Sequence, residues 1–325
     1  MTRRHLIDLV LTGTVGTLAC APSKAGILAR LSQGARSTDL VTIDTLVPEA
    51  MTVIGADAGR LVLPERPGRL SVGPDGRWVA WFPYSSSVYP ESTEGPLAYF
   101  TDNPRSARRV RLKGRFGARL AISSGAERLA VAVVVGAEAT TRLVVLKPAT
   151  GAVEHDVSDL ITWFSLRDLE RLRLSGSGER LVAGSRNRFS VVDLPSHKVL
   201  LEGEGRFPAL SPSGEAIAFV DGHRKLNLTT LATGATRRLL RRSTTHGVGS
   251  WTPDGALLLA AVEGPLSFFC YLVAVDCSAD ACAEIARLEE HDSGQECALI
   301  NRRLLTPART AASVQPVRPS PLRTV

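Results

Sequence analysis

The chain has 325 residues, of which 44% are hydrophobic and 22% are charged, and its formal net charge is +7. This balance is typical of a globular protein, and the length suffices for one large domain or two medium ones. Aromatic residues make up only 5% of the chain and are not interleaved with the basic ones, so we expect no nucleic-acid partner. The composition excludes neither side of a membrane, so the N-terminus must indicate the compartment.

Residues 1–19 have the layout of an export signal peptide. The pair Arg3-Arg4 precedes an apolar stretch that is too short and too polar for an ordinary membrane anchor. The start resembles a twin-arginine export motif, and Thr17-Leu18-Ala19-Cys20 resembles a bacterial lipoprotein box with Thr17 where Leu is typical. We expect an exported protein with lipidation at Cys20, anchored in the membrane of the cell envelope, in the periplasm or at the cell surface. The alternative is a plain secretory signal in which Cys20 is incidental.

A short phrase recurs five times along the chain. It consists of an apolar run, a turn rich in Ser, Pro, Asp and Gly, and a second apolar run, as in LSVGPDGRWVAWF at 70–82 and LSPSGEAIAF at 210–219. The small residues that end the five turns are 50, 52, 36 and 41 positions apart: Gly76, Ala126, Gly178, Gly214 and Gly255. Repeats at such a spacing predict an array of supersecondary units.

Each phrase predicts an inner β-hairpin, because two strand-like runs flank a turn in which glycine can take a positive φ. An alternating outer hairpin follows, for example at 188–205 and 225–242. Four strands per repeat, packed around a common centre, are typical of a β-propeller.

Both ends of the chain contain unpaired pieces of this pattern. Residues 51–69 match an outer hairpin without an inner pair, and residues 295–308 match an inner pair without an outer hairpin. We therefore expect an all-β fold: a six-bladed β-propeller of four-stranded antiparallel blades over 48–305, with the last blade closed by both chain ends. Residues 20–47 are expected to be a tether, and 306–325 a disordered tail rich in Pro and Arg.

The phrases SPSGEAIAF and GPDGRWVAW resemble the Ser-Pro-Asp-Gly repeats of the TolB-like and WD-like β-propeller superfamily. The resemblance implies the fold much more than the function, because that superfamily includes envelope scaffolds, peptidase-associated propellers and proteins of other kinds. TolB carries a globular domain before its propeller, and residues 21–46 are too short to supply one.

Four cysteines follow Cys20, and an oxidising envelope favours two disulfides among them. Cys277 and Cys282 flank the expected turn of the fifth outer hairpin, so we expect a bond between them. Cys270 and Cys297 would then link the fifth blade to the closing blade. The spacing is not that of structural zinc, and the six histidines have no metal-ligand spacing, so we expect no metal.

A candidate binding face follows from propeller topology. The loops that join consecutive blades and the middle loops within blades share one face around the channel, where ligands usually bind. The residues assigned to this face are Tyr84, Tyr89, Arg115, Trp163, Glu204, Arg206, His223 and His246.

Known catalytic motifs are absent from the sequence: there is no Gly-x-Ser-x-Gly elbow, phosphate-binding loop or His-Glu-x-x-His. We therefore favour a protein-binding or scaffolding module of the bacterial cell envelope, monomeric and without a cofactor, whose partner is a protein or a glycan. The alternative is a propeller enzyme, a carbohydrate lyase or hydrolase, with its site in the channel mouth.

Overall fold

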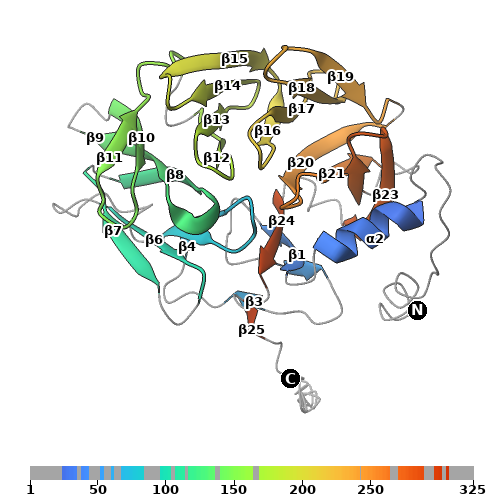
Figure 1. Cartoon of the computed structure of the whole chain (residues 1–325), viewed down its shortest axis with the longest axis horizontal. Helices are drawn as coiled ribbons and strands as arrows, with labels where there is room; N and C mark the ends of the chain where they lie inside the picture. The colour runs from blue at the N-terminus through green and yellow to red at the C-terminus, as the bar shows by residue number, and fades with distance from the viewer. Residues whose placement is uncertain are drawn as a thin grey trace, which may run out of the picture.

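A computed structural model of the chain describes residues 24–34, 38–43, 52–54, 60–61, 67–83, 96–103, 107–113, 116–135, 140–163, 168–241, 243–263, 270–288, 296–301 and 305–306. Within these residues, five antiparallel sheets of four strands lie around a common centre (Figure 1). In each sheet the first strand in the sequence is innermost and the fourth is outermost. The expected all-β propeller architecture is therefore present.

The five sheets follow one another along the chain. Sheet 1 contains β4 (Pro67–Val72), β5 (Val79–Pro83), β6 (Leu97–Thr101) and β7 (Arg108–Arg111). Sheet 2 contains β8 (Phe116–Ile122), β9 (Leu129–Val135), β10 (Thr140–Leu146) and β11 (Val153–Asp156). Sheet 3 contains β12 (Arg171–Leu174), β13 (Arg180–Gly184), β14 (Arg188–Asp193) and β15 (Lys198–Glu204). Sheet 4 contains β16 (Arg206–Leu210), β17 (Ala216–Val220), β18 (Leu226–Thr230) and β19 (Thr236–Leu239). Sheet 5 contains β20 (Thr245–Trp251), β21 (Leu257–Glu263), β22 (Cys270–Asp276) and β23 (Ala281–Leu288).

The recurring phrase encodes one hydrogen-bonded turn between the two inner strands. In sheet 3, Ser175 Oγ accepts from the amide of Arg180 at 3.1 Å, while the amide of Ser175 donates to the carbonyl of Arg180 at 2.9 Å. The amide of Gly178 donates back to the carbonyl of Ser175 at 3.0 Å. Sheets 2, 4 and 5 repeat all these bonds with Ser123, Ser211 and Thr252 in the place of Ser175. Each repeat thus contains a tight turn in which a Ser or Thr side chain accepts a hydrogen bond from a nearby main-chain amide.

The same turns also join neighbouring sheets. The amide of Ser124 donates to the carbonyl of Gly176 at 3.1 Å, and the amide of Gly176 donates to the carbonyl of Pro212 at 2.7 Å, so three successive turns are bonded in series. Arg180 extends the pattern, because its guanidinium donates to the carbonyl of Gly214 in the next sheet at 2.7 Å. The repeated residues therefore fix the spacing of the sheets as well as the turns.

Apolar side chains fill the spaces between adjacent sheets. Phe82 and Leu129 are fully buried between sheets 1 and 2, and Phe189 packs on Phe219 between sheets 3 and 4 with ring centroids 4.8 Å apart. A single four-stranded sheet cannot bury its own two faces. Each sheet therefore packs against its neighbours, and both faces of the inner strands are covered. The burial pattern of β9, with six of its seven residues buried, illustrates this packing.

The two ends of the chain meet in a three-stranded sheet of order β2-β1-β24. It pairs β1 (Thr38–Ile43) with β24 (Glu296–Asn301) and with β2 (Thr52–Ile54). A further short pair joins β25 (Leu305–Thr306) to β3 (Arg60–Leu61). β24 lies beside β20 and also contacts β4.

These strands differ from the expected sixth blade. The described residues form five sheets of four strands rather than six, and the predicted inner pair at 295–308 is one strand, β24, followed by the two-residue β25. The middle of the three-stranded sheet is β1, which was not expected as a strand. Its sequence, TDLVTI, alternates polar and apolar residues only briefly and lies in a segment without the recurring turn phrase.

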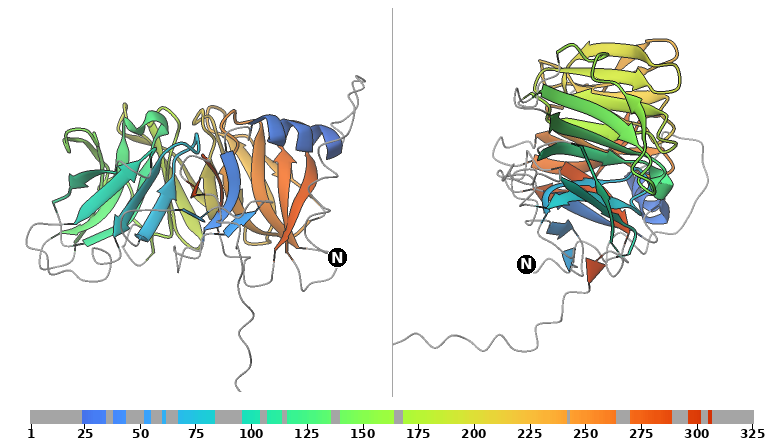
Figure 2. Two further views of the ribbon diagram at one scale, coloured as in Figure 1. Left: turned by 90° about the horizontal axis from the view of Figure 1, so that it is seen from below. Right: turned by 90° about the vertical axis from the view of Figure 1, so that its left-hand side faces the viewer.

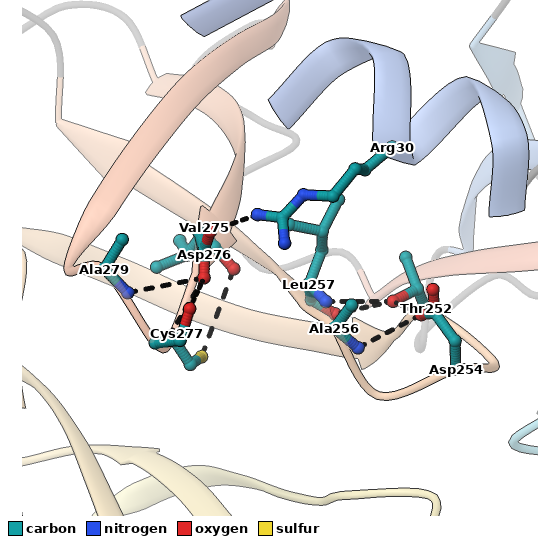
Figure 3. Close-up of polar contacts among 10 residues, drawn as sticks. Arg30, Thr252, Asp254, Ala256, Leu257, Val275, Asp276, Cys277 and Ala279 are labelled. Carbon is teal, nitrogen blue, oxygen red and sulfur yellow. Dashed lines mark hydrogen bonds and ion pairs between the residues drawn. The ribbon is translucent and has the colours of Figure 1, made fainter. Parts of the chain in front are cut away.

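A helix lies in the segment that was expected to be a tether. α2 (Lys24–Gly34) covers sheet 5, with Ile27 completely buried against Leu257, Ala274 and Ala283 (Figure 2). Arg30 of α2 forms an ion pair with Asp276 at the end of β22 (Figure 3). α2 is therefore part of the folded domain. Across the residues that the structure describes, no helix is both long and apolar enough to cross a membrane.

Candidate functional site

Loops of sheets 3, 4 and 5 form a cavity of about 910 Å³. It lies where loops that lead into innermost strands meet loops that join second and third strands, as expected for the functional face of a propeller. The side chains on which the following argument depends are Trp163, Arg188, Arg206, Phe207, Arg224 and His246. An adjoining cavity of about 600 Å³ shares Trp163, Arg188 and Arg206 and is also lined by Glu202 and Glu204.

Trp163 forms an aromatic wall of both cavities. Its indole Nε1 donates to Ser190 Oγ at 2.8 Å, and Ser190 Oγ donates to Glu202 Oε1 at 3.2 Å. Ser190 is completely buried on β14, so this short chain of hydrogen bonds fixes the orientation of the indole. A fixed aromatic surface can contact a ligand at little cost in side-chain entropy.

Two guanidinium groups lie close to the ring of Phe207. The Arg171 guanidinium carbon is 5.0 Å from the centre of the Phe207 ring, and the Arg206 guanidinium carbon is 5.7 Å from it. Both distances are within the range of cation–π attraction. Phe207 has a φ of 55° and Arg224 a φ of 58°, so two residues with strained backbones border the same cavity. Such strain concentrates at functional sites.

The cavity carries an excess of positive charge. Among the described residues, Arg188, Arg206 and Arg224 have no ion-pair partner, whereas Arg186 at the rim pairs with Glu170 at 3.0 Å. Guanidinium groups present N–H donors in a planar fork that matches carboxylates and phosphates. The arrangement is suited to an anionic ligand.

The carboxylate of Asp221 accepts hydrogen bonds from the loop in which it lies. Its Oδ1 accepts from the amides of His223 at 2.8 Å and Lys225 at 2.9 Å, and its Oδ2 accepts from Asn227 at 3.1 Å. Burial alone would raise the pKa of Asp221, but these hydrogen bonds and the nearby Arg238 outweigh it and lower the pKa. Asp221 is therefore an ionised group that holds the loop between β17 and β18.

His246 lies at the edge of the cavity on β20. Its Nε2 is 4.0 Å from Glu263 Oε2, which is too long for a hydrogen bond, and this nitrogen is buried without a partner among the described residues. A ligand group that reaches this edge would therefore meet a buried imidazole nitrogen.

The structure brings several of the predicted binding-face residues together. Trp163, Arg206 and His246 line one cavity and Glu204 the adjoining one, whereas His223 is exposed beside it in the loop between β17 and β18. Tyr84, Tyr89 and Arg115 lie outside the described residues. Sequence reasoning missed Arg188, Phe207 and Arg224. Arg188 begins a strand of an expected outer hairpin and gave no loop signal, and the positive φ of Phe207 and Arg224 is not visible in the sequence.

The cysteine predictions differ from the structure at the hairpin between β22 and β23. Cys277 and Cys282 are free thiols, so the expected bond between them is not present. Cys282 lies opposite Val275, two residues before Cys277, and such a diagonal pair has a Cα separation of about 7–8 Å, beyond the usual reach of a disulfide. The side chain of Cys297, expected to bond to Cys270, lies outside the described residues. In the described part of the chain, no three His, Cys, Asp or Glu side chains are grouped so that they could hold a metal ion.

Comparisons with known proteins show the fold. No protein-family model matches the sequence, and no curated protein matches it significantly. TolB from Acinetobacter baumannii aligns with 84% of this chain and 70% of its own at a TM-score of 0.52 and 15% sequence identity. The β-propeller domain of the trilobed protease from Pyrococcus furiosus aligns with 66% of this chain and 69% of its own, at a TM-score of 0.47 and 13% identity. The chain is thus similar to TolB in having a TolB-like β-propeller fold.

Proposed function

We propose that this chain is a binding module of the bacterial cell envelope, and that the cavity between sheets 3, 4 and 5 captures an acidic segment of a protein partner. The observation that carries the proposal is the set of three guanidinium groups, Arg188, Arg206 and Arg224, that surround one cavity without ion-pair partners among the described residues. Trp163 and Phe207 supply aromatic surface between these charges. Trp and Arg are the residue types that most often dominate binding energy at protein interfaces.

The side chains that would contact the carboxylates of a partner are already ordered in the free protein. The hydrogen bond of Trp163 to Ser190 and the contacts of Phe207 with two guanidinium groups hold the side chains in position before a ligand arrives. These side chains then lose little conformational entropy when a ligand binds, which favours a high affinity. The rigid sheets present the loops, and the loops make the contacts.

The state of Asp221 favours binding over catalysis. A general acid needs a raised pKa, but the pKa of Asp221 is lowered and its carboxylate is committed to the loop backbone. His246 and Glu263 lie side by side at 4.0 Å without a hydrogen bond. A lyase or hydrolase would need a proton donor and acceptor poised on opposite sides of a substrate.

Site-specific photo-crosslinking in living cells tests the proposal. A photoreactive amino acid replaces Asn187, which is exposed between Arg186 and Arg188 at the rim of the cavity, and a second variant carries it at Arg109 on the outermost strand β7. We expect a discrete adduct only from position 187, and mass spectrometry should locate the crosslink in an acidic segment of an envelope protein.

A matched pair of charge variants completes this experiment. Arg188→Glu combined with Arg206→Glu should abolish the adduct. Arg109→Glu combined with Arg237→Glu makes the same charge change on outermost strands and should leave it. For a fluorescent Glu-rich peptide, each charge removed from the cavity should weaken binding to the purified protein about tenfold, with a strong dependence on salt. An equal yield of the adduct from the two double variants would contradict the proposal. Binding of an anionic polysaccharide in preference to the peptide would also contradict it.

We propose that the protein is exported and lipidated at Cys20, on the basis of the arginine pair, the apolar stretch and the residues around Cys20. Replacement of Cys20 by Ala should move the protein from the membrane fraction to the soluble envelope fraction. Membrane association that persists in this variant would exclude the anchor.

We also propose that the sheet β2-β1-β24 acts as the sixth blade and closes the ring with both chain ends. The supporting observations are the pairing of β1 with β24 and the contacts of β24 with β20 and β4. Val41 lies opposite Ala298, so cysteines at these two positions should form a disulfide under mild oxidation and raise the melting temperature. Failure of this pair to crosslink in the folded protein would exclude closure through these strands.

A further inference from the structure

The helix α2 is held at one end of sheet 5. Ile27 is completely buried against Leu257 at the start of β21 and Ala283 near the start of β23. Arg30 pairs with Asp276, the last residue of β22 (Figure 3). These contacts lie where the turns from β20 to β21 and from β22 to β23 are found, and a side view of the ring shows α2 at this level (Figure 2). A buried apolar side chain and an ion pair to a buried carboxylate therefore fix α2 on this end of the sheet.

The basic cavity lies at the opposite end of the same sheet. Thr245 and His246 line it from the start of β20, whereas the turn beside α2 follows Trp251 at the end of β20. A strand of seven residues is about 20 Å long. α2 and the cavity are therefore on opposite faces of the propeller, separated by the length of the strands.

The turns that follow the innermost strands of sheets 2 to 5 lie on the face of α2. Hydrogen bonds join the turns of sheets 2, 3 and 4 through Ser124, Gly176 and Pro212. Pro212 in turn neighbours Gly255 of sheet 5, where a Cβ would lie 3.7 Å from the proline ring. We call the side of the ring that carries these turns and α2 the turn face, and the side that carries the basic cavity the cavity face.

The chain between Cys20 and α2 is short. α2 begins at Lys24, so four residue-to-residue steps separate it from Cys20, and they span at most about 14 Å in any conformation. An acyl chain on Cys20 inserts into the bilayer and keeps this residue at the membrane surface. The start of α2 is then held within about 14 Å of that surface.

These two lengths exclude one orientation of the propeller. If the cavity face rested on the bilayer, the strands would hold α2 about 20 Å above the membrane surface. This height exceeds the span of about 14 Å that the chain from Cys20 can bridge. If α2 lies next to the bilayer, the same chain is long enough, and the cavity opens on the far side.

We propose that the lipid bilayer lies against the α2 side of the propeller and that the basic cavity opens away from it, so that the partner approaches from the envelope space. This inference rests on the proposed lipidation of Cys20. α2 suits such a position because its sequence includes Lys24 and Arg30 but no acidic residue.

The short tether, rather than attraction to lipid, sets this orientation. Each turn of sheets 2 to 5 on the turn face carries an exposed carboxylate, and anionic headgroups do not attract such a surface. The residues are Glu127, Glu179, Glu215 and Asp254. The turn face therefore lies near the bilayer because α2 is held there.

Energy transfer from defined positions to the membrane tests the orientation. The full lipidated chain is reconstituted on preformed phosphatidylcholine vesicles that carry an acceptor dye on their headgroups. A fluorescent amino acid replaces Ala25 on α2, Glu215 before β17 or His223 after β17, all of which are exposed. The last two positions lie at opposite ends of one strand, about 17 Å apart, and form a matched pair. We expect strong transfer from position 25, and transfer from position 215 about twofold or more above that from position 223.

Flotation of the vesicles separates the anchor from the orientation. The chain should float with the vesicles, and Cys20→Ala should not. Flotation of neither protein, or of both, would exclude the lipid anchor, and the inference would fall with it. If the chain floats but transfer from position 223 equals or exceeds that from position 215, the orientation is wrong although the anchor is present.

A longer tether tests the cause of the orientation. Insertion of about twenty Gly and Ser residues after Ser23 adds a flexible segment with a root-mean-square span of about 25 Å, which exceeds the length of the strands. This variant should still float, and its transfer from positions 215 and 223 should become similar. A difference that persists would show that the turn face itself binds lipid, and would overturn the role of the tether.

Binding of the fluorescent Glu-rich peptide gives a second measurement. The peptide should bind the chain on vesicles as tightly as the chain in detergent, because the cavity opens away from the bilayer. Binding that is weaker only on the vesicles would overturn the orientation. Absence of binding in both preparations would contradict the proposed function of the cavity, and the energy transfer would still decide the orientation.

Discussion

Arg171 donates from its guanidinium to the main-chain oxygen of Val248 at 2.7 Å, and this hydrogen bond joins β12 of sheet 3 to β20 of sheet 5. The two strands are separated in the ring by β16, whose Phe207 stacks on the same guanidinium at 5.0 Å. One side chain thus contacts three consecutive sheets. Because Arg171 is 7% exposed, these contacts are made away from solvent and are weakly screened.

Removal of this bridge should destabilise the protein. Arg171→Gln shortens the side chain and removes the charge, so the carbonyl of Val248 loses its donor and Phe207 loses a cation. We expect a decrease of about 1–3 kcal/mol in the free energy of unfolding, measured by guanidinium chloride denaturation. Arg109→Gln on the exposed face of β7 is the control and should change it by less than about 0.5 kcal/mol. A similar small effect for both variants would show that the bridge is not structural.

The sequence predicted the five sheets because the residues that form each turn are local. Ser175, Gly178 and Arg180 lie within six positions, and their hydrogen bonds need no distant partner. The sheet at the chain ends was predicted less well, because β1 is defined by pairing with β24, more than 250 residues away, and no turn phrase marks it. α2 was missed for a similar reason, since its folding depends on the surface of sheet 5 that covers Ile27.

The candidate site was predicted in part. Trp163, Arg206 and His246 were assigned to loops that share one face, which follows from the order of strands in a propeller. Arg171 and Arg173 lie on the innermost strand β12, for which the recurring phrase predicts an apolar run, so their place near the centre was not predicted. They come near one another and the other innermost strands because the five sheets lie around a common centre.

Substitution of the glycine that ends a turn phrase should destabilise the protein most where neighbouring atoms leave little space for a Cβ. Gly178 has a φ of 72°, and a Cβ there would lie 3.0 Å from Ser123 Cβ and Arg128 Cδ of the adjacent sheet. Gly178→Ala should lower the free energy of unfolding by about 1–3 kcal/mol. The equivalent Ala126 already has a φ of 55°, so Ala126→Gly should be neutral or stabilise by up to about 1 kcal/mol. Equal signs for the two changes, in denaturation experiments on both variants, would contradict this interpretation of the repeat.

The thiols of the hairpin between β22 and β23 should react slowly and in a defined order. Burial raises the pKa of Cys277 to about 12, and burial also raises that of Cys282, which is more exposed. At pH 8 only about one Cys277 in ten thousand would be a thiolate, so iodoacetamide should label Cys282 first. Peptide mass spectrometry measures both rates, and the unfolded protein, in which the rates should converge, is the control. A peptide pair bonded between Cys277 and Cys282 in a non-reduced digest would contradict the structure.

The docking of α2 should depend on pH through Asp276. Burial alone would raise the pKa of Asp276, but hydrogen bonds from Ser278 and Arg30 outweigh it and lower the pKa. A carboxyl whose pKa is lower in the folded state stabilises the fold above its unfolded value, about 3.9, and this contribution is lost as the pH falls through the folded value. Protection of the α2 amides against hydrogen exchange, corrected for intrinsic rates, should therefore decrease below about pH 4.

A matched pair of variants separates the helix contact from the turn. Asp276→Asn should lower the protection of α2 at pH 7 by about tenfold and remove its dependence on pH, because the ion pair with Arg30 is lost. Asp193 ends β14 in the same way and accepts from the amide and hydroxyl of Ser196, but its described contacts do not include α2, so Asp193→Asn should leave α2 unchanged. If both variants loosen α2 equally, the effect comes from the general stability of the propeller and not from the contact between Arg30 and Asp276.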